Sequence, residues 1–176
     1  MKKLLAILSF VLFSSFAFSQ KIAVVDSKYI MENIPEYNAA QDQLDDLSVE
    51  WQKEIEAKFT EISKLYDNYK AEQVLLPEDL KQKRIAEIEK KEKEAKELQK
   101  KRFGKDGDLF KKRQELIKPI QDKVYNAIND LSTQGNYQIV FDKSSDLIML
   151  YVNSKIDISD DVLSKLGYTP GGQKKQ

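Results

Sequence analysis

The feature that most constrains the fold is an apolar stripe that recurs with helical spacing from Tyr37 to Tyr69. Ten side chains mark nine steps over 32 residues, about 3.56 residues per step: Tyr37, Ala40, Leu44, Leu47, Trp51, Ile55, Phe59, Ile62, Tyr66 and Tyr69. This spacing lies between the heptad repeat of a coiled coil and the period of a straight α-helix. The stripe is narrow and the other positions are mostly polar, so we predict a long helix that needs a partner in water.

The sequence that follows predicts this partner. The segment Leu75-Leu76-Pro77-Glu78-Asp79 interrupts the pattern, because Pro77 disfavours helix at the residue before it and carboxylates suit a new helix N-terminus. A second helical stretch is predicted from about Leu80 to Ser132. Residues 36–75 carry 10 acidic and 4 basic groups, whereas residues 78–118 carry 15 basic and 10 acidic groups. Opposite charge favours an antiparallel hairpin over the alternative of two separate solvated helices.

The position of the turn also predicts which residues face each other and where the hairpin bends. Folding the chain back on Pro77 makes the numbers of facing residues sum to about 154, so that Trp51 faces Phe103 and Pro35 faces Pro119. The arm comprises residues 35–119 with its tip near 75–79, and its outgoing helix is about 60 Å long. Proline kinks a helix and glycine weakens it. The hinge candidates are therefore Pro35, Gly104, Gly107 and Pro119.

Three short apolar runs flank the predicted arm and read as β-strands. They are KIAVVD at 21–26, YQIVFD at 137–142 and LIMLYV at 147–152. A short helix is expected after the first run and another, capped by Ser159, after the third. Residues 20–34 and 120–167 are thus predicted to form a small β body, with a disordered tail at 168–176. The strands are apolar on both faces, so both faces need cover. Either their own short helices cover them or other copies of the chain do, and we favour the second alternative. The predicted fold class is α+β, mostly α.

The N-terminus predicts export. Lys2 and Lys3 precede an apolar run, and the small residues Ala17 and Ser19 suit a cleavage site, so residues 1–19 are interpreted as a signal peptide. Without it the chain carries 27 basic and 29 acidic groups, a balance that does not support nucleic-acid binding. The chain has no Cys, which removes lipid attachment through cysteine and any disulfide framework. The mature protein is expected to be soluble in an envelope or external compartment.

The residue inventory argues against most enzyme chemistry. The chain contains no His, the commonest general base, and no Cys, the thiol nucleophile. It therefore also lacks the commonest zinc ligands. Asp26 and Asp142 both end apolar strands and are interpreted either as an acidic pair or, as we favour, as turn and capping residues. We therefore expect no enzyme, no metal and no cofactor.

Candidate contact residues lie along the arm. The aromatic residues Trp51, Phe59, Tyr66 and Tyr69 are more consistent with the hairpin seam than with a binding surface. Leu75 and Leu76 differ from them, since a tip offers little surface against which to bury a leucine. They are interpreted equally as local packing or as an exposed contact for a client protein or a membrane.

Four segments in a fixed order carry a resemblance to a known family. KIAVVD at 21–26, DGDLFKKRQELIKPIQDKVYNAI at 106–128, YQIVFD at 137–142 and DISDDVLSKL at 157–166 surround the charged hairpin. In these segments the chain resembles the Skp/OmpH family of periplasmic chaperones. The resemblance implies a homotrimer that binds unfolded outer-membrane β-barrel proteins without ATP, prevents their aggregation and passes them to the assembly machinery.

The resemblance also implies which residues form the shared body and where this chain departs from the family. The implied body residues are Ile22, Val24, Ile139, Phe141, Ile148 and Leu150. Well-known members are strongly basic, which suits acidic clients and anionic lipids. This chain has a pI of about 6.4, so its net charge does not supply that attraction to clients, membrane lipid or lipopolysaccharide. The alternative function is a structural spacer or adaptor of the cell envelope.

Overall fold

The computed structural model describes residues 21–146, 148–170 and 173–174. The predicted signal peptide at 1–19 lies outside them. Ile34–Lys123 form one compact unit, and the described residues before and after this range form another. Helix α5 contributes its first part to the former and its second part to the latter. We call the first unit the arm and the second the body.

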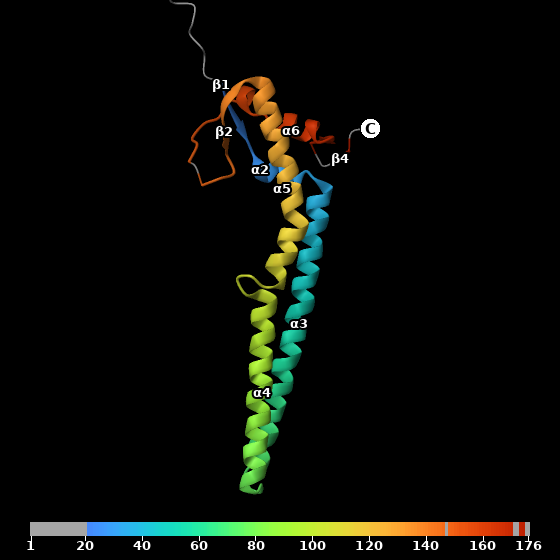
Figure 1. The fold of residues 1–176 in the computed structure, drawn as a ribbon, viewed down its shortest axis with the longest axis vertical. Helices are drawn as coiled ribbons and strands as arrows, with labels where there is room; N and C mark the ends of the chain where they lie inside the picture. The colour runs from blue at the N-terminus through green and yellow to red at the C-terminus, as the bar shows by residue number, and fades with distance from the viewer. Residues whose placement is uncertain (1–20, 147, 171–172, 175–176) are drawn as a thin grey trace, which may run out of the picture. The chain divides into compact units, whose positions relative to one another are not determined.

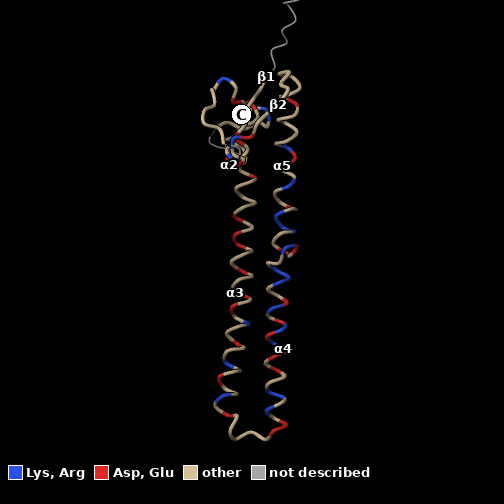
Figure 2. The backbone as a smooth tube through the Cα atoms, turned by 90° about the vertical axis from the view of Figure 1, so that its left-hand side faces the viewer, with Lys and Arg blue, Asp and Glu red and all other residues tan. Residues whose placement is uncertain are grey.

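The arm is an antiparallel hairpin of long helices (Figure 1). Helix α3 spans Pro35–Glu72, helix α4 spans Glu78–Phe103, and helix α5, Asp108–Gly135, begins in the arm. Pro35 occupies the first turn of α3, where its missing N–H costs no hydrogen bond, and Pro77 is the N-cap of α4. Acidic residues predominate along α3 and basic residues along the return path (Figure 2). The predicted fold class and hairpin are confirmed.

Three contacts confirm the predicted register between α3 and α4. The rings of Trp51 and Phe103 meet edge to face with their centroids 6.3 Å apart. The ammonium of Lys91 lies 2.8 Å from Glu61, and the guanidinium of Arg102 lies 3.3 Å from Glu54. In each pair the residue numbers sum to within two of 154. The pairing of Pro35 with Pro119 remains a prediction.

The seam is apolar where the stripe of α3 meets α4. Ile62, Ile88 and Ala95 form a buried cluster, against which Leu65 and Tyr69 pack. Other buried stripe positions include Ala40, Leu44, Trp51 and Ile55. The partner that the narrow stripe requires is therefore supplied by the return path of the same chain.

The return path is not the single helix expected from Leu80 to Ser132. Helix α4 ends at Phe103, and α5 starts at Asp108, so the turn at 104–107 separates them. At Gly104 a Cβ would collide with the carbonyl oxygen of Lys100, and at Gly107 it would lie 2.7 Å from that of Lys101. The glycines thus break the helix, where the sequence predicted only weakening. Pro119 lies inside α5, as expected.

The body is built around a two-stranded parallel sheet. Strand β1, Lys21–Val25, pairs with β2, Tyr137–Asp142, and Ile22 faces Ile139 in the register. On the other edge of β1, Ile158 donates its N–H to Val24 at 2.9 Å. Helix α2, Ser27–Glu32, and helix α6, Ser159–Lys165, lie against each other, and the 3-10 turn η2 spans Ser154–Ile156. The largest fully buried side chains are those of Ile30, Val162 and Leu163.

Three expectations for the body are wrong. The predicted strand at 147–152 does not form in its described part, residues 148–152, which pair with neither β1 nor β2. Ser159 does not cap α6, because Ile158 is the N-cap and the carboxylate of Asp157 accepts the N–H of Ser159 at 3.0 Å. The tail is not wholly disordered, as β3, Tyr168–Thr169, pairs antiparallel with β4, Gln173–Lys174.

Candidate functional site

The tip of the arm presents apolar side chains to solvent. Helix α3 ends at Glu72 and α4 begins after Pro77, and the residues between them pack little of their surface. Val74 and Leu75 are each 86% exposed, Leu80 is also exposed, and Leu76 is half-buried. The tip prediction named Leu75 and Leu76 but missed Val74 and Leu80. The unbroken apolar run from 74 to 76 was the available signal for Val74.

The four aromatic candidates on α3 divide into two pairs. Trp51 is buried and Tyr69 packs against the seam. Phe59 and Tyr66 are 37% and 48% exposed, and the ammonium of Lys70 lies 5.0 Å from the centre of the Tyr66 ring. The exposed pair is seven residues apart and therefore shares one face of the helix. The tip and this face offer separate apolar contacts on an otherwise charged arm.

The body exposes a second apolar surface in the single chain. Ile22 and Ile139 are register partners, yet they are 39% and 50% exposed. In the segment after β2, Ile148, Leu150 and Tyr151 are all more than four-fifths exposed. Of the other predicted body residues, Val24 is buried and Phe141 is half-buried. These exposed residues come from two segments, the paired strands and the stretch after β2, and we refer to them together as the apolar body face: Ile22, Ile139, Ile148, Leu150 and Tyr151.

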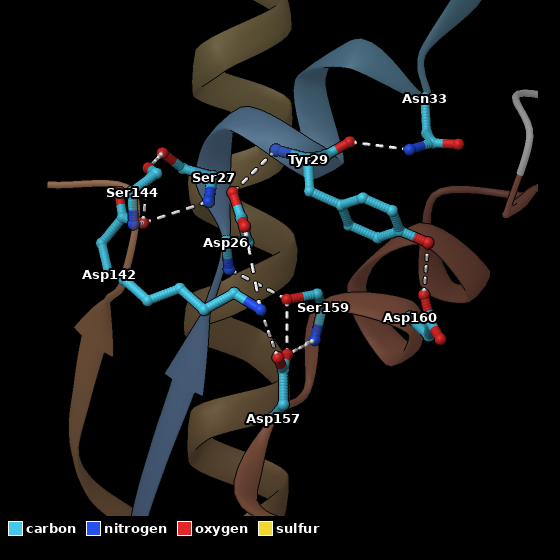
Figure 3. Close-up of polar contacts among 10 residues, drawn as sticks. Asp26, Ser27, Tyr29, Asn33, Asp142, Ser144, Asp157, Ser159 and Asp160 are labelled. Atoms are coloured by element: carbon cyan, nitrogen blue, oxygen red, sulfur yellow. Dashed lines mark hydrogen bonds and ion pairs between the residues drawn. The ribbon is translucent and has the colours of Figure 1, made fainter. Parts of the chain in front are cut away.

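The two strand-end carboxylates are turn and capping groups (Figure 3). Asp26 accepts the backbone N–H of Tyr29 at 2.8 Å and so caps helix α2. Asp142 accepts the backbone N–H groups of Ser27 and Ser144 at 3.1 and 3.0 Å. Burial alone would raise the pKa of Asp142, but the hydrogen bonds from these serines outweigh it and hold the pKa below its usual value. The favoured interpretation of both residues is confirmed.

Lys143 connects the ends of the body strands to the C-terminal segment. Its ammonium lies 2.8 Å from Asp157 and 3.7 Å from Asp26, and the hydrogen bond with Asp157 raises the pKa of Lys143. Burial would raise the pKa of Asp157, but hydrogen bonds from Lys143 and Ser159 lower it overall. Lys143 thus neutralises the carboxylates of Asp26 and Asp157 and links the strand ends to the C-terminal segment of the body. Across the described ranges, no group of three or more residues is suited to hold a metal ion.

No described helix combines the length and apolar character needed to cross a membrane. The arm and the body each present exposed apolar residues to solvent. A long charged hairpin with exposed apolar residues is joined to a small parallel-sheet body whose apolar face is open in the single chain.

The family model for outer membrane proteins (OmpH-like) matches residues 21–166, and the chain belongs to this family. The fold also matches a crystal structure of an OmpH-like protein from Caulobacter crescentus CB15, provisionally described as an outer membrane chaperone. That match has a TM-score of 0.67 and 15% sequence identity, and it covers 84% of each chain. No curated protein matches the chain significantly. The family resemblance predicted from the sequence is confirmed.

Proposed function

We propose that this chain is an ATP-independent holdase chaperone that binds unfolded outer-membrane β-barrel proteins in the periplasm and prevents their aggregation. Membership of the OmpH-like family supports the proposal. The observation that carries it is the set of exposed apolar side chains along a charged hairpin, with Val74 and Leu75 each 86% exposed at the tip. An unfolded β-barrel chain exposes alternating apolar residues and would find several weak contacts on such an arm.

Weak contacts suffice because they act together. A single exposed leucine binds an apolar partner poorly, but several contacts on one scaffold raise the effective concentration of each remaining one. No ATP is needed for this mode of holding, because release follows when a tighter partner competes for the client. The outer-membrane assembly machinery would be such a partner.

We further propose that the chain works as a homotrimer. The apolar body face would be covered by neighbouring copies, because exposed apolar segments beside a sheet edge otherwise promote uncontrolled aggregation. Ile139, at 50% exposure, and Leu150, at 96%, would then become buried at subunit contacts. The arms of three chains would enclose a shared space for the client. We assign no catalytic residue and place the mature protein in the periplasm after removal of residues 1–19.

The test combines solution mass with protection of a client. The mature protein is examined by light scattering and then mixed with an outer-membrane β-barrel protein diluted from urea, whose aggregation is followed by turbidity. We expect a trimer and suppression of turbidity. Val74→Ser with Leu75→Ser should weaken suppression, whereas the matched polar change Gln73→Ser should not.

The outcomes separate the two functions under consideration. A trimer that gives no protection would refute the holdase and favour the envelope spacer. A monomer without protection would refute both the holdase function and the proposal that neighbouring copies cover the apolar body face. Equal protection by the tip variant and its control would show that the tip does not contact the client.

A further inference from the structure

The break between α4 and α5 is closely packed only at Gly107, which is buried. The turn residues Lys105 and Asp106 are exposed. Two backbone hydrogen bonds support the turn and the start of α5, from the N–H of Gly107 to Gly104 at 2.9 Å and from Lys111 to Gly107 at 3.0 Å. A glycine-flanked turn of this kind permits many directions of the following helix. Contacts beyond the turn, including the burial of Ile117 and Ile120 on α5, must therefore fix the direction of this helix within the arm.

One side chain contacts all three helices at this point. The guanidinium of Arg102, in the last turn of α4, donates to Asp108 at the start of α5 at 2.8 Å. It also donates to Glu54 on α3 at 3.3 Å and lies over the ring of Trp51, 4.7 Å from its centre. We call these four residues, Arg102, Asp108, Glu54 and Trp51, the Arg102 latch. Arg102 thus bridges the break and also joins both sides of it to the opposite helix.

The surroundings make this cluster stronger than an ordinary surface ion pair. The side chains of Arg102 and Asp108 are only 24% and 25% exposed, whereas the comparable pair of Lys91 and Glu61 is 34% and 57% exposed. Partial removal of water strengthens both the ion pairs and the contact between the cation and the ring. Burial lowers the pKa of Arg102, but the hydrogen bonds to Asp108 and Glu54 outweigh this and raise the pKa overall.

We propose that the Arg102 latch holds the break in one geometry, and that the arm bends at residues 104–107 when the latch opens. Glycines alone would make a permanently loose joint. With the latch, the joint has a closed state, in which Arg102 bridges the helices, and an open state, in which its charges are hydrated. The arm then adapts to clients of different size by a discrete step, and its stiffness is set by one guanidinium.

The chain provides a matched control for this proposal. Lys91 and Glu61 also form an ion pair between α3 and α4, but they lie on uninterrupted stretches of both helices. Lys91→Gln removes one interhelical charge pair without touching the break. Arg102→Gln removes the equivalent charge at the break. A merely stabilising pair would give the same response in both variants, whereas a latch would give a local response in one of them.

Two measurements on the mature protein test the latch. Trp51 is the single tryptophan of the chain, so quenching of its fluorescence by acrylamide reports on the latch directly. Hydrogen exchange followed by mass spectrometry reports opening of residues 104–111. In Arg102→Gln we expect about tenfold faster exchange at 104–111 and more efficient quenching, with residues 84–96 unchanged. Lys91→Gln should leave exchange at 104–111 within about twofold of the unmodified protein.

Milder variants keep the test valid if Arg102→Gln unfolds the arm. Glu54→Gln and Asp108→Asn each remove one partner and should each accelerate exchange at 104–111 by a smaller factor. Unchanged exchange there in all three variants would overturn the proposal. Equal acceleration along the whole arm would overturn it too, because the effect would then be general stabilisation. Neither measurement includes a client, so the result is independent of the holdase proposal.

Discussion

Truncation of Ile30 is expected to unfold the body selectively. Ile30 lies in α2 and is 0% exposed. Ile30→Ala removes three carbon atoms, and loss of their burial costs about 2.4 kcal/mol at about 0.8 kcal/mol per methylene. A remaining cavity of about 60 Å³ would add about 1.4 kcal/mol. Because local collapse can fill part of this cavity, we expect the free energy of unfolding of the body to fall by about 2.5–4 kcal/mol.

The assay must observe the body separately, because the long helices of the arm dominate the circular dichroism signal. Hydrogen exchange of the amides in β1 and β2 reports opening of the sheet. A loss of about 2.5–4 kcal/mol should accelerate this exchange about 70-fold to 800-fold when unfolding of the body limits it. The refuting result is an acceleration of less than about tenfold, which would mean that Ile30 is not a core residue of the body.

A matched control removes the same three carbons from an exposed position. Ile148 is 87% exposed, so within one chain Ile148→Ala should change the exchange of the β1 amides by less than about threefold. A large effect that depends on protein concentration would instead show that another copy of the chain covers Ile148.

Three further predictions concern pH, the break and the register. Asp142 and Asp157 have lowered pKa values in the folded body, so the stability that they contribute is present above about pH 4 and is lost as pH falls through the folded pKa values. Asp142→Asn should therefore reduce the dependence of urea unfolding on pH below about pH 4. At Gly107 an added Cβ would lie 2.7 and 2.8 Å from two carbonyl oxygens, so Gly107→Ala should destabilise the arm by about 1–3 kcal/mol in thermal unfolding. Trp51→Cys with Phe103→Cys should form an intramolecular cross-link in this cysteine-free chain, whereas Trp51→Cys with Lys93→Cys should not.

The hairpin could be predicted because its determinants are local or periodic. The spacing of the stripe, the proline at the turn and the opposite charges of the two helices each point to the same antiparallel pairing. Once Pro77 fixes the turn, the register follows by counting, and the contact of Trp51 with Phe103 confirms it. The sequence predicted a weakened helix at 104–107 and not a break, because helix propensity treats each glycine as a separate small loss of helix stability. In the structure both glycines occupy positions where a Cβ would collide with backbone oxygens.

The body was harder to predict because its contacts join distant parts of the chain. Strands β1 and β2 pair in parallel although more than 100 residues separate them. The apolar composition of residues 147–152 predicted a strand, but a strand forms only where its backbone pairs with another strand, and composition does not show which segments pair. The exposed apolar tip could be predicted from the dipeptide Leu75-Leu76 alone. The Arg102 latch joins residues of α3, α4 and α5, so it has no sequence signature of its own.

The distribution of charge on the arm limits how a client could be attracted from a distance. The acidic α3 and the basic α4 are paired, and helices in contact lie about 8–10 Å apart. This separation is close to the Debye length of about 10 Å at 0.1 M salt, so each helix largely cancels the field of the other beyond its own surface. Long-range steering of an acidic client should therefore be weak, although single lysines remain available for contact.

If the chain is a holdase, its capture rate should consequently respond little to salt. Between about 0.02 and 0.3 M salt we expect the association rate with an acidic unfolded barrel protein to fall by less than about threefold, measured by stopped-flow fluorescence. Asp45→Asn with Asp46→Asn would make the arm more basic without touching the seam, since both residues are exposed on α3. This variant should capture the same client faster at low salt and show a steeper salt dependence. A fall of tenfold or more in the unmodified protein would mean that the lysines of the return path act without cancellation by α3.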